Sequence, residues 1–404
     1  MPAYVYKARD TAGKRVSGTM AAGTQEELVA KLHRMGYMTT QVKEAPLGIP
    51  IASALDRWQG VGTEDMILFN VQLANLINAG ISLLASLDTL SRQIENKRLK
   101  EAIADVSRGV QAGENFSGAL ERHPAIFSKL FISMIKVAEA SGKLDQVLIR
   151  FAAFSEHQAD LRQKIQGAFF YPLILLAACL GVSLFIVTTV IPQFAVIFMK
   201  AGIALPLPTL ILYHAGRAIQ QFWLSIILFL LLAVLGIQTY AGTKGGKFQI
   251  DRLSLSLPLF GSLFRKAAIS RFGRTLATLL SSGVPILQSL EIVREVIGNE
   301  VLARVLSQVH EAVEKGEGIS ETLKISSEFP PDAVQLIEVG EETGKLDEML
   351  GKVSDFYDRS LEYSLKKLTT ILEPLLLVMM GTLIGLIMAS MLLPIFDMMK
   401  VLRR

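Results

Sequence analysis

Charge is scarce in this chain of 404 residues: 19% of them are Asp, Glu, Lys or Arg, whereas 51% are hydrophobic. Soluble domains average about 25% charged residues. The shortage is local, because it is confined to three apolar blocks and the remaining sequence has an ordinary soluble composition. This composition predicts a membrane protein with substantial water-soluble parts.

Cysteine is almost absent as well. The single Cys179 cannot form an internal disulfide, so nothing implies an oxidising compartment. The five histidines are scattered, and without cysteine partners they show no metal-ligand spacing. We therefore interpret them as isolated helix-surface residues: His33, His123, His157, His214 and His310.

Motifs for chemistry are also missing. A phosphate-binding loop needs Ser or Thr after its Gly-Lys pair, but Phe248 follows Gly246-Lys247 and Leu346 follows Gly344-Lys345. No Ser-His-Asp arrangement can be argued, so we expect no enzyme activity and no cofactor. No dense Lys/Arg block indicates nucleic-acid binding. The first forty residues contain no apolar core, so we expect no cleavable signal peptide and a cytoplasmic N-terminus.

Three apolar runs stand out against this background. Ile165–Met199 carries no formal charge, and a membrane span needs roughly 20 apolar residues. A second charge-free run covers Leu375–Phe396, and a shorter apolar block covers Phe222–Ala241. These runs predict three membrane spans. No Asp, Glu, Lys or Arg lies deep in a span, which argues against an ion pathway.

The chain also repeats itself. Aligning Phe69 with Phe272 superposes many identical residues, with one residue lost near Pro124. The pairs include Leu73/Leu276, Gly80/Gly283, Leu87/Leu290, Asn96/Asn299, Gly113/Gly316, Phe127/Phe329, Glu139/Glu341 and Lys164/Lys366. Prolines near the ends of the spans keep the same register: Pro172 with Pro374 and Pro192 with Pro394. Agreement at so many positions predicts a duplication.

Each copy is then a helical domain followed by one membrane span. If both domains lie on one side of the membrane, the chain must cross back between them, and Phe222–Ala241 supplies that crossing. Such repeats are parallel, unlike the inverted repeats of many transporters.

Apolar residues at helical spacing support the helical domains, whereas residues 2–45 alternate strand-like and turn residues around one helical segment.

We therefore predict a mainly α membrane protein with two homologous cytoplasmic helical bundles, three transmembrane helices and a small N-terminal α+β domain. The expected segments are the α+β domain over 1–45, a linker over 46–63, bundle 1 over 64–168, span 1 over 169–198, a short periplasmic link over 199–221, span 2 over 222–241, a cytoplasmic connector over 242–264, bundle 2 over 265–372, span 3 over 373–397 and a tail over 398–404.

The distribution of basic residues predicts the orientation. Basic residues near span ends favour the cytoplasm. On the bundle side lie Arg162, Lys164, Lys244, Lys247, Lys366 and Lys367. The link between the first two spans has only Lys200 and Arg217, although the tail, with Lys400, Arg403 and Arg404, argues the other way. The larger asymmetry predicts that both bundles are cytoplasmic.

A Gly-Lys-Leu-Asp motif occurs in both copies, at Gly142–Asp145 and at Gly344–Asp347. One interpretation is capping, in which the glycine ends one helix and the aspartate starts the next. The other is a charged face for a partner, to which nearby acidic residues would contribute: Glu139, Glu338, Glu341 and Glu342.

Small residues recur inside the spans. Gly381-x-x-x-Gly385 lets helix backbones approach closely, and its counterpart in the first copy is Cys179-x-x-x-Ser183. This spacing predicts helix packing, either within one chain or between chains.

The chain resembles the type II secretion F family, the inner-membrane platform of type II secretion systems and type IV pili. The resemblance covers nearly the whole chain. Its motifs are Tyr4…Ala8…Gly13…Gly18, Gly340-Glu341-Glu342-Thr343-Gly344-Lys345-Leu346-Asp347, Tyr171-Pro172, Pro192…Phe194…Phe198…Gly202…Leu205-Pro206…Thr209, and Glu373-Pro374 with Gly381. In the first copy, Ala138 departs from the usual Gly-Glu-x-x-Gly, while Gly142 is kept.

This resemblance implies a non-enzymatic assembly platform in the bacterial inner membrane that forms small homo-oligomers. It further implies contacts with a hexameric cytoplasmic assembly ATPase, with other inner-membrane assembly proteins and with pilin or pseudopilin subunits that pass into a filament. Each bundle is then expected to contain about six helices. Which of the two machines the chain serves stays open.

Two other functions are open from the residues alone: a small-molecule or ion transporter, and a transmembrane signalling protein built on a parallel duplication. A sensor needs a sizeable outer domain, and the link from Lys200 to Gln221 is too short for one.

Overall fold

The computed structural model describes residues 3–9, 15–21, 25–34, 36–44, 60–200 and 205–402. They belong to two units, Met1–Gly62 and Thr63–Arg404. Most of the expected linker, residues 46–59, lies outside the described residues, as do Arg403 and Arg404.

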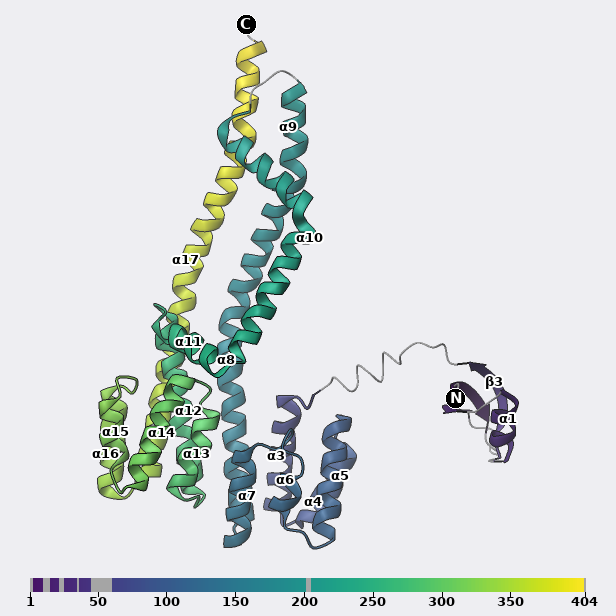
Figure 1. The fold of residues 1–404 in the computed structure, drawn as a ribbon, viewed down its shortest axis with the longest axis vertical. Coiled ribbons are helices and arrows are strands. Elements are labelled where there is room, and N and C mark those ends of the chain that lie inside the picture. The colour runs from purple at the N-terminus through teal and green to yellow at the C-terminus, as the bar shows by residue number, and fades with distance from the viewer. Residues whose placement is uncertain are drawn as a thin grey trace. The chain divides into compact units, whose positions relative to one another are not determined.

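The described residues of the first unit form a small sheet and one helix (Figure 1). Strands β1 (Ala3–Arg9), β2 (Arg15–Ala21) and β3 (Met38–Glu44) form an antiparallel sheet in the order β2-β1-β3. Helix α1 (Gln25–Arg34) buries Leu28 and Leu32, which lie one helical turn apart. Three strands and a helix agree with the small N-terminal α+β domain that the sequence predicts.

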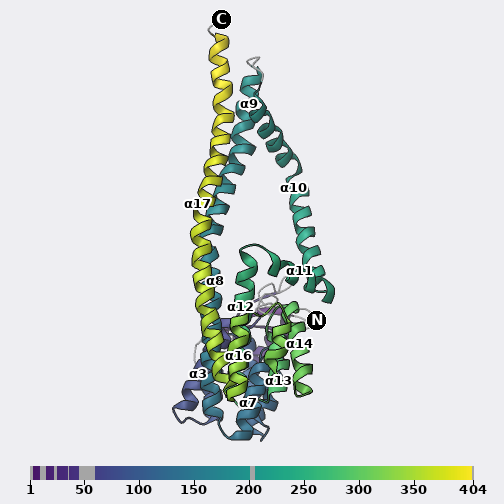
Figure 2. The same cartoon turned by 90° about the vertical axis from the view of Figure 1, so that its left-hand side faces the viewer.

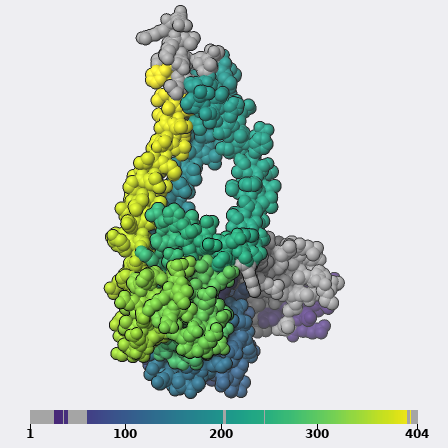
Figure 3. Space-filling view, turned by 60° about the vertical axis from the view of Figure 1, so that its left-hand side comes forward, coloured from purple at the N-terminus to yellow at the C-terminus, as the bar shows by residue number. Residues whose placement is uncertain are grey.

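The second unit contains two sets of six helices among its described residues. The first copy has α3 (Thr63–Asn78), α4 (Leu83–Gln93), α5 (Lys97–Gln111), α6 (Phe116–Glu121), α7 (Lys129–Ser141) and α8 (Leu144–Phe185). The second has α12 (Phe260–Ser281), α13 (Ile286–Val296), α14 (Glu300–Glu314), α15 (Ile319–Ile325), α16 (Pro331–Thr343) and α17 (Leu346–Leu402). Figure 3 shows the second copy, in green, as one mass beside the lower part of α17, and α12 and α16 pack against that helix.

Corresponding residues have the same structural roles in both copies. Phe69 and Phe272 are fully buried. The ring centroid of Phe69 lies 6.0 Å from that of Phe127, and the ring centroid of Phe272 lies 5.2 Å from that of Phe329. Asn96 and Asn299 each cap the next helix, because their side-chain oxygens accept two backbone N–H bonds. These shared details confirm the predicted duplication.

In the part of the chain that the structure describes, three helices are long and apolar enough to cross a membrane, as predicted, within Leu144–Lys200, Leu207–Ala241 and Leu346–Leu392. The first consists of α8, the π-helical turn η1 (Ile186–Val190) and α9 (Ile191–Lys200). The second is α10 (Leu207–Ala241), so residues 207–221, where we expected an irregular link, are helical. Helix α11 (Lys244–Ser256) then occupies the expected connector. Figure 2 shows α8 and α17 side by side.

The span prolines do not begin helices. Pro172 lies inside α8 and Pro374 inside α17, so each long helix runs unbroken from its bundle into its span. Pro394 also falls within α17. Pro192 is the second residue of α9, directly after η1.

The π-helical turn leaves two backbone carbonyls without their usual α-helical donors. The N–H of Ile191 bonds to Ile186 instead of Val187, and Pro192 has no N–H to offer Thr188. Helix α10 meets both carbonyls. Gln220 donates its side-chain amide to the Thr188 carbonyl, and Gly216 packs against the Val187 carbonyl. Unpaired backbone groups are costly in lipid, so this contact stabilises the pairing of the first two spans.

A substitution at Gly216 tests this contact between α10 and the first span. A Cβ at Gly216 would lie 2.1 Å from the Val187 carbonyl oxygen, so Gly216→Ala should force α10 away and destabilise the protein by about 1–3 kcal/mol. Gly236→Ala is the matched control, because a Cβ at Gly236 on the same helix has no neighbour within 4 Å. Thermal unfolding of the purified protein in detergent compares the two variants. Equal midpoints for the two variants would contradict the proposed contact.

Candidate functional site

The repeated Gly-Lys-Leu-Asp motif forms the same turn in both copies. Gly142 and Gly344 end α7 and α16 in the left-handed conformation, with φ of 69° and 67°. In the first copy, the N–H of Lys143 bonds to the Ala138 carbonyl at 3.0 Å, and the second copy repeats this bond. This is the Schellman arrangement, which reverses the chain tightly into the long helix. It is formed with Ala138 in place of glycine.

The aspartates of the motif lie two positions beyond the capping residue, which is Lys143 in α8. The long helices begin at Leu144 and Leu346, and no side-chain cap is formed at the start of α8. Asp145 and Asp347 lie in the first helical turn and are exposed, so their charge faces the positive end of the helix dipole.

The motif glutamates cap a different helix. Glu139 accepts the backbone N–H bonds of Phe116 and Ser117 at the start of α6, and Glu341 does the same for Ile319 and Ser320 at the start of α15. Each carboxylate thus satisfies two N–H groups that a helix start leaves unpaired.

These bonds limit the acidic face that we expected at the motif. The carboxylates of Glu139 and Glu341 are committed inside their bundles, and Glu338 pairs with Lys324. Glu342 is exposed and remains a candidate for contacting a partner, together with the two aspartates.

A polar cluster that the sequence did not reveal joins the two copies. Asp358 of α17 is its centre, with a side chain that is 9% exposed. Its carboxylate accepts hydrogen bonds from His157 Nε2 of α8 at 2.8 Å and from Arg274 of α12 at 2.9 Å. Ser270 and Ser354 also donate to it. The cluster therefore ties α8 of the first copy to α12 and α17 of the second.

The environment of Asp358 stabilises its charged form. Burial alone would raise the pKa of this carboxyl, but the hydrogen bonds from His157, Ser270 and Arg274 outweigh burial and lower the pKa to about 2. Relative to the ordinary value of 3.8, this shift corresponds to about 2 kcal/mol of stabilisation at neutral pH.

Two further ion pairs connect the copies. Lys164 of α8 pairs with Glu362 of α17 and also with Asp160 on its own helix, and these bonds raise the pKa of Lys164. Lys129 of α7 pairs with Glu295 of α13 at 2.7 Å. Both pairs are exposed, so each contributes less than about 1 kcal/mol.

The interpretation of His157 as an isolated surface residue was wrong. Its partner is 201 positions away in the sequence, which no local pattern reveals. The repeat could not point to it either, because the first copy has Ile67 and Val71 where the second has Ser270 and Arg274. The cluster exists once, and only because the two copies have diverged.

The small residues of the spans differ between the copies. Cys179 and Ser183 are buried, at 5% and 8% exposed. Gly381 and Gly385 are open, because a Cβ at either position would have no neighbour within 4 Å.

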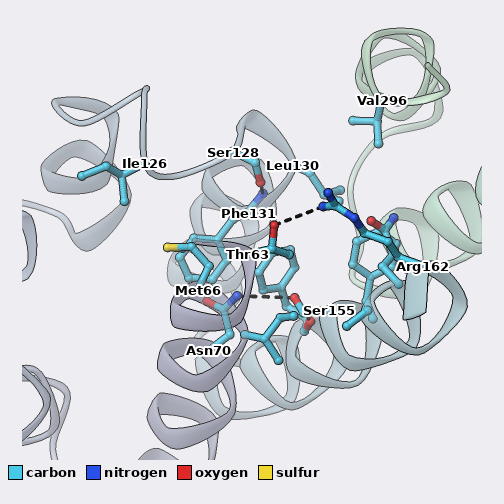
Figure 4. A pocket seen from close by; sticks show the side chains of 15 residues that line it. Thr63, Met66, Asn70, Ile126, Ser128, Leu130, Phe131, Ser155, Arg162 and Val296 are labelled. Carbon is cyan, nitrogen blue, oxygen red and sulfur yellow. Dashed lines mark hydrogen bonds between the residues drawn. The ribbon is translucent and has the colours of Figure 1, made fainter. Parts of the chain in front are cut away.

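A hollow of about 280 Å³ lies beside α3, α7 and α8 (Figure 4). Asn70 is 4% exposed; its amide nitrogen donates to Ser155 at 3.4 Å, and its Oδ1 has no partner among the described residues. The corresponding residue of the second copy is Gly273, where a Cβ would lie 2.9 Å from the Leu350 carbonyl of α17. Helices α3 and α8 also pack together, but only the glycine allows the close backbone approach seen between α12 and α17.

The fold defines a class of protein: a membrane protein built from a duplicated six-helix unit whose last helix continues as a membrane span. The comparisons with known proteins agree with this class. A family model described as "Type II secretion system (T2SS), protein F" matches twice, at residues 69–192 and 272–394, and a model of the N-terminal domain of the same family matches residues 1–43.

Relatives match over nearly the whole chain. The "Type IV pilus assembly protein PilC" of Thermus thermophilus is 38% identical, over 100% of this chain and 99% of the relative. The "Type II secretion system protein F" of Xanthomonas campestris is 33% identical, over 98% of this chain and 99% of the relative. The "Type IV pilus assembly protein PilC" of Pseudomonas aeruginosa is 30% identical, over 91% of this chain and 98% of the relative. The chain belongs to the type II secretion system protein F family.

Asp358→Asn should destabilise the protein by about 2 kcal/mol at pH 7, because the charge that binds Arg274 and His157 is lost. The folded-state pKa is below the unfolded one, so this contribution is complete above about pH 4 and is lost as the pH falls toward 2. The difference from wild type should shrink over that interval.

Denaturant unfolding of the purified chain in mixed micelles measures this difference. Asp355→Asn is the control, because Asp355 also pairs with Arg274 but is 56% exposed, and its loss should cost less than about 1 kcal/mol. Equal effects of the two substitutions, or an effect of Asp358→Asn that does not change with pH, would refute the central role of Asp358.

Proposed function

We propose that this protein is the inner-membrane platform on which type IV pili or type II secretion pseudopili are assembled. In this proposal it couples a cytoplasmic hexameric ATPase to the movement of pilin or pseudopilin subunits from the membrane into the filament. The observation that supports the proposal most is the full-length similarity to proteins named for both machines.

The helices offer a means of coupling. Helix α17 is continuous from Leu346 to Leu402, about 85 Å at 1.5 Å per residue. Helix α8 likewise leaves the first bundle and enters the membrane without a break. A displacement of either bundle is therefore passed to its span by an unbroken rod. The Asp358 cluster and the ion pairs between the copies make the two rods move together.

The orientation follows from charge. The bundle sides of the spans carry more basic residues than the link between the first two spans. In the proposal, both bundles and the N-terminus are therefore cytoplasmic, where the ATPase acts. Exposed Glu342, Asp145 and Asp347 are the candidate contacts for that partner or for other assembly proteins of the membrane.

The spans leave room for further contacts in the membrane. In the most apolar stretch of α10, no residue is buried within the chain. In the most apolar stretch of the third span, 11% of the residues are buried. Pilin helices, lipid and a second copy of this chain are the proposed occupants. Gly381 and Gly385 are the proposed contact of a homo-oligomer, because their surfaces are open within one chain.

No energy source is assigned to the chain itself. In the proposal the ATPase supplies the work, and this protein acts without a cofactor and without catalysis.

Deletion of the gene in its host should abolish filaments while pilin or pseudopilin still accumulates in the membrane. Wild-type protein should restore assembly. A two-glycine insertion after Thr370 of α17 should not, because two glycines cost about 2 kcal/mol of helix stability and shift the register of the rod. The same insertion after Lys315, in the exposed turn before α15, is the control and should restore assembly.

Filament counts by electron microscopy, with protein levels checked by immunoblot, decide the result. Filaments in the deletion strain would refute the platform proposal. Normal assembly with the insertion in α17 would leave the platform but refute coupling through a continuous helix.

A further inference from the structure

A second hollow, of about 430 Å³, lies between α8 and α12. Three arginines line it: Arg162 from α8, and Arg271 and Arg274 from α12. Gln158, Gln166 and His157 add polar groups, and no carboxylate is among the described residues that line it. Its walls therefore belong to both copies of the duplicated unit.

Positive charge in this hollow is not fully balanced. Arg274 pairs with Asp355 and Asp358, yet its buried Nε has no partner among the described residues. Arg271 donates only to the Ile297 carbonyl, and Arg162 only to Thr63, so neither has a carboxylate partner in the described parts of the chain.

On α12, Arg274 has two carboxylate partners, so the unbalanced charge is that of Arg271. Arg271 and Arg274 are three residues apart, a spacing that brings like charges together on a helix. Burial lowers the pKa of Arg271, which means that the guanidinium is desolvated without gaining an ionic partner. An anion between the arginines would offset both the repulsion between their like charges and the desolvation of Arg271.

The hollow also lies close to the membrane. Gln166 precedes Phe169, where the first span is expected to begin, by three residues, or about 5 Å along α8. The membrane end of the hollow therefore reaches the headgroup layer, which is several ångströms thick on each side of the hydrocarbon, and Arg162 lies about 10 Å before Phe169 along α8. Leu161, Ile165 and Ala267 give the same hollow an apolar wall.

We propose that this hollow binds a phosphate-bearing anion that bridges the two copies. Guanidinium groups bind phosphate oxygens in pairs, and paired arginines are the common protein ligands of such groups. The headgroup of an anionic phospholipid has this chemistry at this depth, and a soluble phosphate compound shares the chemistry.

Binding is measured on the full chain in an uncharged detergent, as the rise in thermal unfolding midpoint. One arm titrates short-chain phosphatidylglycerol against phosphatidylcholine, and the other titrates pyrophosphate against chloride at equal ionic strength. The phosphate ligand should raise the midpoint saturably. Arg162→Gln combined with Arg271→Gln should weaken the apparent affinity at least tenfold, and the corresponding lysine pair should weaken it less.

The matched control is Arg359→Gln combined with Lys367→Gln, which removes two exposed positive charges from α17 outside the hollow. This variant should bind like wild type. A response to phosphatidylglycerol alone assigns the ligand to lipid, and a response to pyrophosphate alone assigns it to a soluble compound. Equal binding by the glutamine pair and the control, or no saturable response in either arm, would overturn the proposal. If the glutamine pair does not fold, the lysine pair decides: affinity equal to wild type would overturn it.

Discussion

The bilayer imposes the constraint on which this structure depends: every backbone polar group that crosses it must be satisfied within the protein. Both copies meet that requirement in the same way, by extending the last helix of a soluble bundle through the membrane. Two parallel copies then need one return crossing, and α10 provides it. Where Pro192 interrupts the regular bonding of the first crossing, Gln220 of the return helix donates to the Thr188 carbonyl, and Gly216 lets the two helices approach closely.

Divergence after duplication created the contacts between the copies. The matching cores preserve identical residues such as Phe69 and Phe272, whereas the Asp358 cluster includes Ser270 and Arg274, which are Ile67 and Val71 in the first copy. Asp358 gathers its partners from three helices, and Asn70 opens a hollow where Gly273 closes one. The shared residues build each bundle, and residues that differ, such as Ser270 and Arg274, contribute to the junction between the bundles.

Much of the fold could be predicted from the sequence, because it depends on signals that are local or repeated. Charge-free runs give the spans, and the spacing of identical residues such as Asn96 and Asn299 gives the duplication. The helical start of α10 was missed, because Pro206 and Pro208 indicate a turn while helix begins at Leu207. The polar junction was missed because His157 and Asp358 are 201 positions apart and because Ser270 and Arg274 have apolar counterparts in the first copy. Capping of α6 by Glu139 was missed because the two lie more than twenty residues apart.

The central claim is that both bundles lie on one side of the membrane and continue directly into it. Single cysteines at Gln111 and at Glu314, two exposed and corresponding positions, test it in a chain with Cys179→Ala. Labelling with a membrane-impermeant maleimide is compared in right-side-out and inverted vesicles. The account predicts that both positions are labelled from the same face, and only from that face. Labelling of the two positions from opposite faces would contradict it.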